Sequence, residues 1–291
     1  MNNQLDYQHF ILTRFNIALW HQAKDGCEVR TNQWLKHRFS LFETYCLPSI
    51  AAQTCKSFDW IILFDSNTSD YYKKKIAGYQ AKCPQLIPIY VDASQAIQFR
   101  QVFKTEIEKR LKASRVITSY LDNDDALNIK YVEDVQKRAL SVSDNTFINY
   151  TDGYQVFTDY QYVLKVHFPT NHFISVVEQG VPSMIKTVYG YGSHAILNEK
   201  HGIKIEKVKN LPMWCEVVHE KNMYNDAIFF IRAKMIGDGD ILRREFSIDK
   251  NVRSGIGLYV FVFVPRYIRV CTRRAIARLG FYRGRWVHPS S

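Results

Sequence analysis

The chain lacks several features that would point away from an intracellular globular protein. Its six cysteines form no C-x-x-C pair, which argues against a structural zinc site or a disulfide framework and predicts mostly buried free thiols. The opening MNNQLDYQHF has neither the basic flank nor the apolar core of a secretory signal. No run reaches the roughly 18 apolar residues that span a membrane. We therefore expect a cytoplasmic protein.

Acidic residues are missing from one part of the chain. Residues 251–291 contain eight arginines and no Asp or Glu, so residues 1–250 carry only +3 of the net charge of +11. A basic segment on a nearly neutral body predicts one local anionic partner rather than nucleic acid bound along the whole surface. With 291 residues, 46% of them hydrophobic, the chain can form one large α/β domain or two small ones.

Apolar runs alternate with helical patterns through the first 121 residues. Strands are predicted at residues 9–17, 58–68, 85–94 and 115–121, and helices at 32–53 and 95–113. Within the first helix, Pro48 predicts a stop or a kink. This alternation indicates an α/β fold with an open, doubly wound, mostly parallel sheet, whose ligands bind beyond the carboxyl ends of the strands. Asp65, Asp92 and Asp122 lie at such ends.

The second half has weaker patterns. Residues 145–157 and 160–168 predict a hairpin. Residues 256–264 are apolar but too short to span a bilayer, and we expect Pro265 to end them. The following residues have the pattern of a basic amphipathic helix. We therefore divide the chain into a domain at 1–250 and a basic tail at 251–291.

Three aspartates are crowded into the segment LDNDDAL, directly after a predicted strand. Several carboxylates at a strand end suit Mg²⁺ or Mn²⁺, which could in turn clamp a diphosphate. Alternatively, Asp122 or Asp124 caps a helix through ALNIKYVEDVQKRAL. A metal-dependent phosphatase would fit the same spacing, whereas a calcium loop lacks its Gly and distal Glu.

Five segments carry a more specific resemblance: LTRFNI, WLKHRFSLFETYCLPSIAAQTCKSFDWIILFD, YLDNDDAL, NHFISVVE and MWCEVVHEKNMYND. In this order they are similar to a bacterial rhamnosyltransferase family, over roughly residues 8 to 230. The first half also resembles GT-A-type glycosyltransferases, with their strand-end Asp and Asp-x-Asp metal motif. The resemblance implies a GT-A-like fold and an inverting, metal-dependent glycosyltransferase using Mn²⁺ or Mg²⁺. The implied donor is a nucleoside diphosphate sugar such as dTDP-L-rhamnose, and the acceptor is a saccharide or lipid-linked glycan of surface polysaccharide biosynthesis.

The resemblance also implies roles for particular residues. The metal ligands would be Asp124, Asp125 and His219, although His219 could instead be a structural histidine beside Trp214. A carboxylate would accept the proton of the acceptor hydroxyl; we expect Glu178, with Glu216 and Asp152 as rivals. The residues expected to bind the nucleotide sugar are Arg14, Asn16, Asp65, Arg100, Asp122 and Asn123.

The basic tail lies outside the resemblance, so composition alone predicts its partner. Nucleic acid is one alternative, because aromatic residues accompany the arginines and could stack on bases. Anionic lipid fits the mixture of apolar and basic residues better, so we expect peripheral attachment to the inner face of the plasma membrane and no nucleic-acid partner. A metal-dependent phosphatase or nucleotidyltransferase, or a non-catalytic membrane or nucleic-acid adaptor, are the competing functions.

Overall fold

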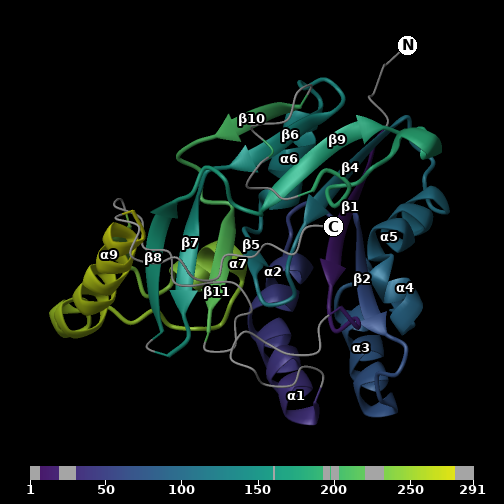
Figure 1. Cartoon of the computed structure of the whole chain (residues 1–291). Coiled ribbons are helices and arrows are strands. Elements are labelled where there is room, and N and C mark those ends of the chain that lie inside the picture. The colour runs from purple at the N-terminus through teal and green to yellow at the C-terminus, as the bar shows by residue number, and fades with distance from the viewer. Residues whose placement is uncertain are drawn as a thin grey trace.

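The computed structural model describes residues 7–19, 31–159, 161–192, 197, 203–219 and 233–278. A seven-stranded sheet lies at the centre of this part of the chain, in the order β10-β6-β9-β4-β1-β2-β3 (Figure 1). Only β9 runs antiparallel to its neighbours. The strands are β1 (Tyr7–Arg14), β2 (Asp59–Asp65), β3 (Leu86–Val91), β4 (Arg115–Tyr120), β6 (Thr146–Tyr150), β9 (Ile174–Gln179) and β10 (Lys204–Val208).

After β4 the chain enters β5, which belongs to a second, smaller sheet. Its strand order is β12-β8-β7-β11-β5. The pairs β7–β8 and β11–β5 are antiparallel, whereas β11 runs parallel to β7. The predicted hairpin at 145–168 is therefore found as β7 and β8, while β6 joins the central sheet. The strands are β5 (Ala126–Leu127), β7 (Asp152–Phe157), β8 (Tyr162–His167), β11 (Trp214–Val218) and β12 (Lys234–Met235).

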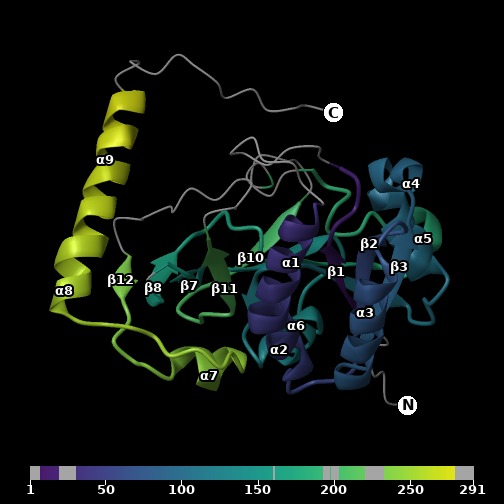
Figure 2. The ribbon, with the colours of Figure 1, turned by 90° about the horizontal axis from the view of Figure 1, so that it is seen from below.

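Helices cover both faces of the central sheet, which confirms the predicted doubly wound α/β arrangement (Figure 2). Alternate side chains of β2 explain this: Trp60 and Ile62 join one core, and Ile61 and Leu63 join the other. The first core is covered by α1 (Asn32–Leu41), the π-helical turn η1 (Phe42–Cys46), α2 (Leu47–Ala51), α3 (Asp70–Lys82) and α6 (Tyr131–Ala139). The second is covered by α4 (Ala93–Ile97) and α5 (Phe99–Glu108).

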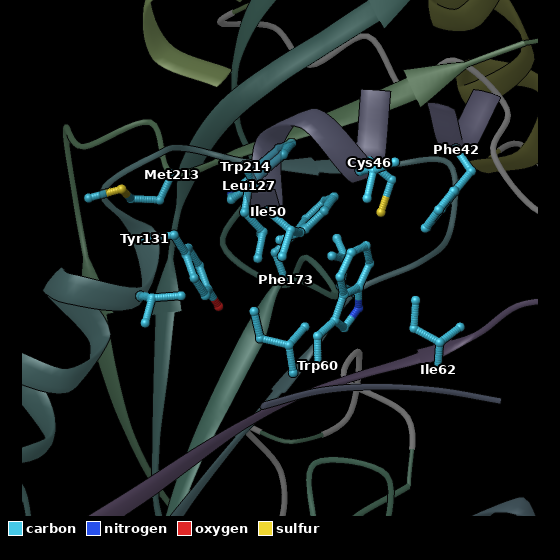
Figure 3. Close-up of a cluster of buried hydrophobic side chains, with 14 of the residues drawn as sticks. Phe42, Cys46, Ile50, Trp60, Ile62, Leu127, Tyr131, Phe173, Met213 and Trp214 are labelled. Carbon is cyan, nitrogen blue, oxygen red and sulfur yellow. The ribbon is translucent and has the colours of Figure 1, made fainter. Parts of the chain in front are cut away.

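Large aromatic side chains fill the first core (Figure 3). Trp60 stacks on Phe42 with ring centroids 5.5 Å apart, and Trp214 stacks on Phe173 at 4.8 Å. Both indole nitrogens donate hydrogen bonds although the rings are buried: Trp60 to Thr13 Oγ1 at 2.9 Å and Trp214 to a backbone carbonyl at 2.8 Å. The core therefore ties the central sheet to the second sheet without leaving these donors unsatisfied.

Neither Pro48 nor Pro265 ends its helix, so the expectation for Pro265 is wrong. Each proline is the second residue of an α-helical segment that follows a π-helical turn, at η1 and at η4 (Tyr259–Phe263). Proline lacks an N–H and its ring collides with the carbonyl four residues earlier in an α-helix. The wider turn pairs carbonyls five residues ahead, which lets the helix continue.

Two of the predicted strand-end and cap assignments turn out differently. Helix α6 begins after Lys130 and has no side-chain cap, so the hypothesis that Asp122 or Asp124 caps it is wrong. Asp92 follows β3 as expected, but its Oδ1 accepts the backbone N–H groups of Ser94 and Gln95 and caps α4. The aspartates after β4 therefore need another explanation.

Gly153→Ala is expected to destabilise the protein by about 2 kcal/mol or more, as overpacking of a filled core does. A Cβ at residue 153 would overlap the ring of Trp214, which is fully buried. Urea unfolding measures the change. Gly78→Ala on α3, where no atom lies within 4 Å of the added Cβ, is the control and should keep or slightly raise stability. Equal stability of the two variants would contradict the packing argument.

The C-terminal segment packs against the second sheet. Helix α7 (Ile241–Phe246) and Val252 belong to a core with β7, β8 and β11. The chain then forms one continuous helix made of α8 (Ile256–Leu258), η4 and α9 (Val264–Arg278), with Phe263 only 6% exposed. The described part of the predicted tail, residues 251–278, is thus packed on the rest of the protein. Residues 279–291 lie outside the described residues.

Candidate active site

The carboxyl ends of β1, β2 and β4 meet at one edge of the sheet, as parallel pairing requires. They bring Arg14, Asn16, Asp65 and Asp122 into one region. Asn16 links two of these ends: its Oδ1 accepts the backbone N–H of Asp65 at 3.1 Å, and its Nδ2 donates to Thr68 at 3.0 Å. The structure therefore places these four residues of the expected nucleotide-sugar site at the same edge of the sheet.

Arg14 lies among aromatic rings beside Asp122. Its guanidinium carbon is 5.0 Å from the ring centroid of Phe99 and 5.2 Å from that of Tyr189. Nη2 donates to Tyr120 Oη at 3.1 Å, and that hydroxyl donates to Asp122 Oδ1 at 2.8 Å. Within the described residues, buried Arg14 Nε has no hydrogen-bond partner. A fixed cation with an unused donor suits an anionic ligand.

Asp122, Asp125 and His172 form a compact group of possible metal ligands. One ligand atom from each lies within 4.8 Å of the other two. His172 Nε2 is 3.1 Å from Asp125 Oδ2, while Asp125 Oδ1 accepts the backbone N–H of Val217 at 2.9 Å. Two carboxylates and an imidazole are suitable ligands for Mn²⁺, and the carboxylates for Mg²⁺. The donor set therefore fits the expected divalent cation.

The carboxylates of this group lie close enough to repel one another. Burial raises the pKa of Asp125, and the negative charges of Asp124 and Asp122 raise it further against the opposing hydrogen bond from His172. Burial favours the neutral imidazole of His172, but the carboxylates of Asp125, Asp122 and Glu216 raise its pKa to about 9. A divalent cation would reduce this repulsion among carboxylates.

Asp124 and His219 are arranged differently from the prediction, which grouped them with Asp125 as ligands. Asp124 Oδ2 accepts from Arg38 Nη1 at 2.6 Å and lies 2.9 Å from His219 Nε2. Burial disfavours the charged carboxylate, yet Arg38 and His219 hold the pKa of Asp124 well below its usual range. The structure thus separates the predicted ligand set into this ion pair and the group around Asp125.

Asn123 and Arg100 support the site through the backbone. Asn123 Nδ2 donates to the carbonyls of Arg14 and Phe15, both at 2.9 Å, so it ties the aspartate loop to the end of β1. Arg100 Nε donates to the carbonyl of Tyr189 at 3.1 Å. These contacts hold residues of the predicted nucleotide site in place.

Of the expected bases, only Glu216 lies with the aspartates. It is 4% exposed, and its Oε2 accepts from Gln155 at 2.6 Å. Burial raises the pKa of Glu216; the nearby charge of His172 lowers it, whereas Asp124 and Asp122 raise it. Glu216 is thus within electrostatic reach of the site from β11.

The structure does not bring Glu178 to the aspartates. On β9 it is paired with Val116, near the start of β4, whereas Asp122 follows the other end of β4. Its carboxylate accepts the backbone N–H groups of Lys186 and Thr187 at 2.9 and 3.0 Å, and the hydroxyl of Tyr191 at 2.9 Å. Glu178 therefore anchors the segment that leads to Tyr189.

Asp152, the third candidate base, is also bonded within the fold. Its Oδ2 accepts from the Thr151 hydroxyl at 2.9 Å and from the backbone N–H of Asn210 at 2.8 Å, and its Oδ1 lies 3.2 Å from His167 Nδ1. These contacts join β7 to β8 and to the loop before β11.

Sequence reasoning missed His172, because it lies 47 residues after Asp125 and precedes a strand whose direction was not known. The available signal lies in the segment NHFISVVE, whose only histidine directly precedes the apolar run that forms β9.

No protein with a curated description matches the sequence. Among solved structures, that of S. aureus TarS residues 1–349 in complex with UDP is similar with a TM-score of 0.43 and 10% identity, covering 73% of this chain and 60% of that one. Another TarS structure gives a TM-score of 0.40 and 11% identity, covering 73% of this chain and 37% of that one. A second structure of TarS 1–349 gives a TM-score of 0.41 and 10% identity, covering 72% of this chain and 60% of that one.

The chain thus spans about 60% of the length of the TarS 1–349 structure that it matches. A protein-family model gives a match over most of the sequence. It covers residues 11–229, which run from the middle of β1 to beyond β11 and include every residue of the site described above. The chain belongs to the family described as "Putative rhamnosyl transferase".

Proposed function

We propose that this protein is a metal-dependent glycosyltransferase. It would transfer a sugar, for which L-rhamnose is the favoured candidate, from a nucleoside diphosphate to a saccharide acceptor. Family membership supports glycosyl transfer as the reaction and rhamnose as the sugar. The observation that carries the metal-dependent part is the Asp122, Asp125 and His172 group at the end of β4. It lies where an open α/β sheet binds its ligands.

In this proposal the donor lies across the ends of β1, β2 and β4. Asp65 and Asn16 line the side toward β2, where a nucleoside would bind, and Arg14 offers its unused Nε beside Asp122. Asp122, Asp125 and His172 would hold Mn²⁺ or Mg²⁺, which as a Lewis acid stabilises the charge on the departing diphosphate. The Tyr120 hydroxyl connects Arg14 and Asp122, since it accepts a hydrogen bond from Arg14 and donates one to Asp122.

Glu216 is the base that the arrangement favours for an inverting reaction. It would accept the proton of the acceptor hydroxyl as that oxygen attacks the anomeric carbon. Glu216 lies on β11 in the second sheet. Strand β11 pairs with β5, which directly follows the aspartates. An acceptor saccharide would therefore approach between β11 and the donor.

Mn²⁺ together with the correct nucleotide sugar is expected to raise the melting temperature by several degrees. A ligand present at a hundredfold excess over its Kd adds about 2.7 kcal/mol to the stability of the folded state. Thermal-shift measurements would compare dTDP-L-rhamnose with UDP- and GDP-sugars, each with Mn²⁺ and with EDTA.

The matched controls are Mn²⁺ alone and the corresponding nucleoside without phosphate. Each alone should give a smaller shift, because neither supplies the diphosphate that the proposed contacts with Arg14 and the metal ion require. If no nucleotide sugar stabilises the protein in the presence of Mn²⁺, the proposal is contradicted.

Product analysis separates the competing enzymes. A glycosyltransferase releases a nucleoside diphosphate, whereas a phosphatase releases phosphate and a nucleotidyltransferase releases pyrophosphate.

We also propose that the acceptor belongs to surface polysaccharide synthesis, as a saccharide or lipid-linked glycan, and that the protein acts at the inner face of the plasma membrane. In the described residues, no helix has both the length and the apolar character needed to cross a bilayer. Any such contact by the described residues would be peripheral.

A further inference from the structure

The helix formed by α8, η4 and α9 stands at the edge of the molecule beside β8 (Figures 1 and 2). One side of it is docked. Phe263 is buried in the core, and Arg266 Nη1 donates to Tyr162 Oη at 3.0 Å. Arg266 also pairs with Asp159, and its guanidinium lies 5.6 Å from the ring centroid of Phe157. These contacts fix the helix to the second sheet.

The opposite side of the helix exposes apolar side chains. Ile256 is 84% exposed, Val260 47%, Phe261 79% and Ile268 57%. The wider π-helical turn at 259–263 rotates α9 about the helix axis relative to the residues before it. Ile268 therefore lies on the same side of the helix as Val260. Five of the eleven large exposed apolar residues in the described part of the chain lie between 256 and 268. This clustering marks an interaction surface.

The charge of the segment indicates which partner this surface fits. The eight arginines of residues 251–291 are accompanied by no Asp or Glu, and Arg269 is exposed on the helix itself. A second copy of the chain would bring the same positive charge against it. Nucleic acid would satisfy the arginines and leave the aliphatic side chains in water. An anionic bilayer satisfies both, with apolar side chains below the headgroups and arginines among them.

We propose that the free face of this helix, with Ile256, Val260, Phe261 and Ile268, inserts at the headgroup level of an anionic bilayer. The docked face keeps the helix fixed on the second sheet. The catalytic body is then held at a set orientation to the membrane surface instead of being tethered by a loose tail. This inference deepens the proposed membrane location by naming the surface that makes the contact. It does not depend on the proposed sugar transfer, because lipid binding can be measured without any transfer reaction.

Co-sedimentation of the full chain with vesicles tests the proposal. Vesicles of phosphatidylglycerol and phosphatidylcholine are compared with pure phosphatidylcholine, at low and high salt. We expect binding to the anionic vesicles only, weakened by salt. The double variant Ile256→Glu/Phe261→Glu should bind at least about tenfold more weakly, since it removes buried apolar area and adds negative charge.

Ile97→Glu is the matched control, because Ile97 is 74% exposed on α4 and lies outside the proposed surface. It should bind like the unchanged protein. Arg269→Gln should cause a smaller, salt-dependent loss. Phe261→Ser alone provides a second test if the double variant does not fold, which its melting temperature and circular dichroism would reveal.

Three results would overturn the proposal. The first is equal vesicle binding by the unchanged protein and a folded Phe261 variant. The second is equal binding to anionic and pure phosphatidylcholine vesicles. The third is the absence of vesicle binding together with a concentration-dependent dimer, or a complex with double-stranded DNA, that the double variant loses. In that case the surface would be assigned to the other partner.

Discussion

Asp125→Asn is expected to abolish Mn²⁺ binding and to lower the rate of sugar transfer at least about a hundredfold, the scale of losing a metal's stabilisation of the departing diphosphate. Asp125 supplies one of the three grouped ligand atoms. Asparagine can still accept the Val217 N–H, so the loop keeps a local contact while the charge is lost. Electron paramagnetic resonance of free Mn²⁺ measures binding independently of transfer.

Asp124→Asn is the informative comparison. Asp124 is bonded to Arg38 and His219 and lies outside the grouped ligand atoms. We expect this variant to lose stability, because a buried Arg38 keeps only part of its pairing. It should still bind Mn²⁺, with an affinity lowered by about tenfold to a hundredfold, the size of an effect from outside the ligand set. Loss of Mn²⁺ binding in Asp124→Asn with retention in Asp125→Asn would show that the ligand assignment is wrong.

Glu216→Gln is expected to lower kcat by about a hundredfold to ten-thousandfold, the usual contribution of a general base. Glutamine fills the same buried space and can still accept a hydrogen bond from Gln155, so the donor site should be unchanged. Donor affinity, measured by calorimetry with Mn²⁺ and the nucleotide sugar, should stay within about threefold, because a base acts in the transition state and not in donor binding.

Glu206→Gln supplies the control for this substitution. Glu206 lies on β10 and pairs with Arg138 at 2.8 Å, in a partly exposed ion pair away from the aspartate loop. Its removal should leave kcat and donor affinity unchanged. Full transfer activity in a folded Glu216→Gln protein would remove Glu216 as the base, and a parallel loss in Glu206→Gln would indicate a general structural effect.

The local sequence pattern was sufficient to predict the positions of the site residues that follow parallel strands. Apolar runs ending in polar residues marked β1, β2 and β4, and parallel strands carry their carboxyl ends to one edge. Arg14, Asp65 and Asp122 therefore come together as predicted. The same reasoning failed for Asp92, since an Asp after a strand can also cap the next helix.

Strand direction explains the main difference between the predicted and observed sites. Glu178 could act as the base only if the strand formed by the segment NHFISVVE ended beside the aspartates. Because β9 runs antiparallel to β4, with Ser175 opposite Ser119, its beginning lies beside the aspartates and its end lies far from them. His172 consequently reaches Asp125, and Glu178 binds the backbone at 186 and 187.

The sequence by itself determined the α/β class, the family, the crowded aspartates after β4 and the basic, apolar C-terminal segment, because composition and period along the chain are local properties. Only the tertiary structure decided that Asp124 pairs with Arg38 while Asp125 joins Asp122 and His172, and that one side of the C-terminal helix is docked. Those outcomes depend on pairing between segments tens of residues apart, on the direction of β9 and on the π-helical turn before Pro265. Loop-closing contacts of that kind are set by packing in three dimensions, and no local pattern encodes them.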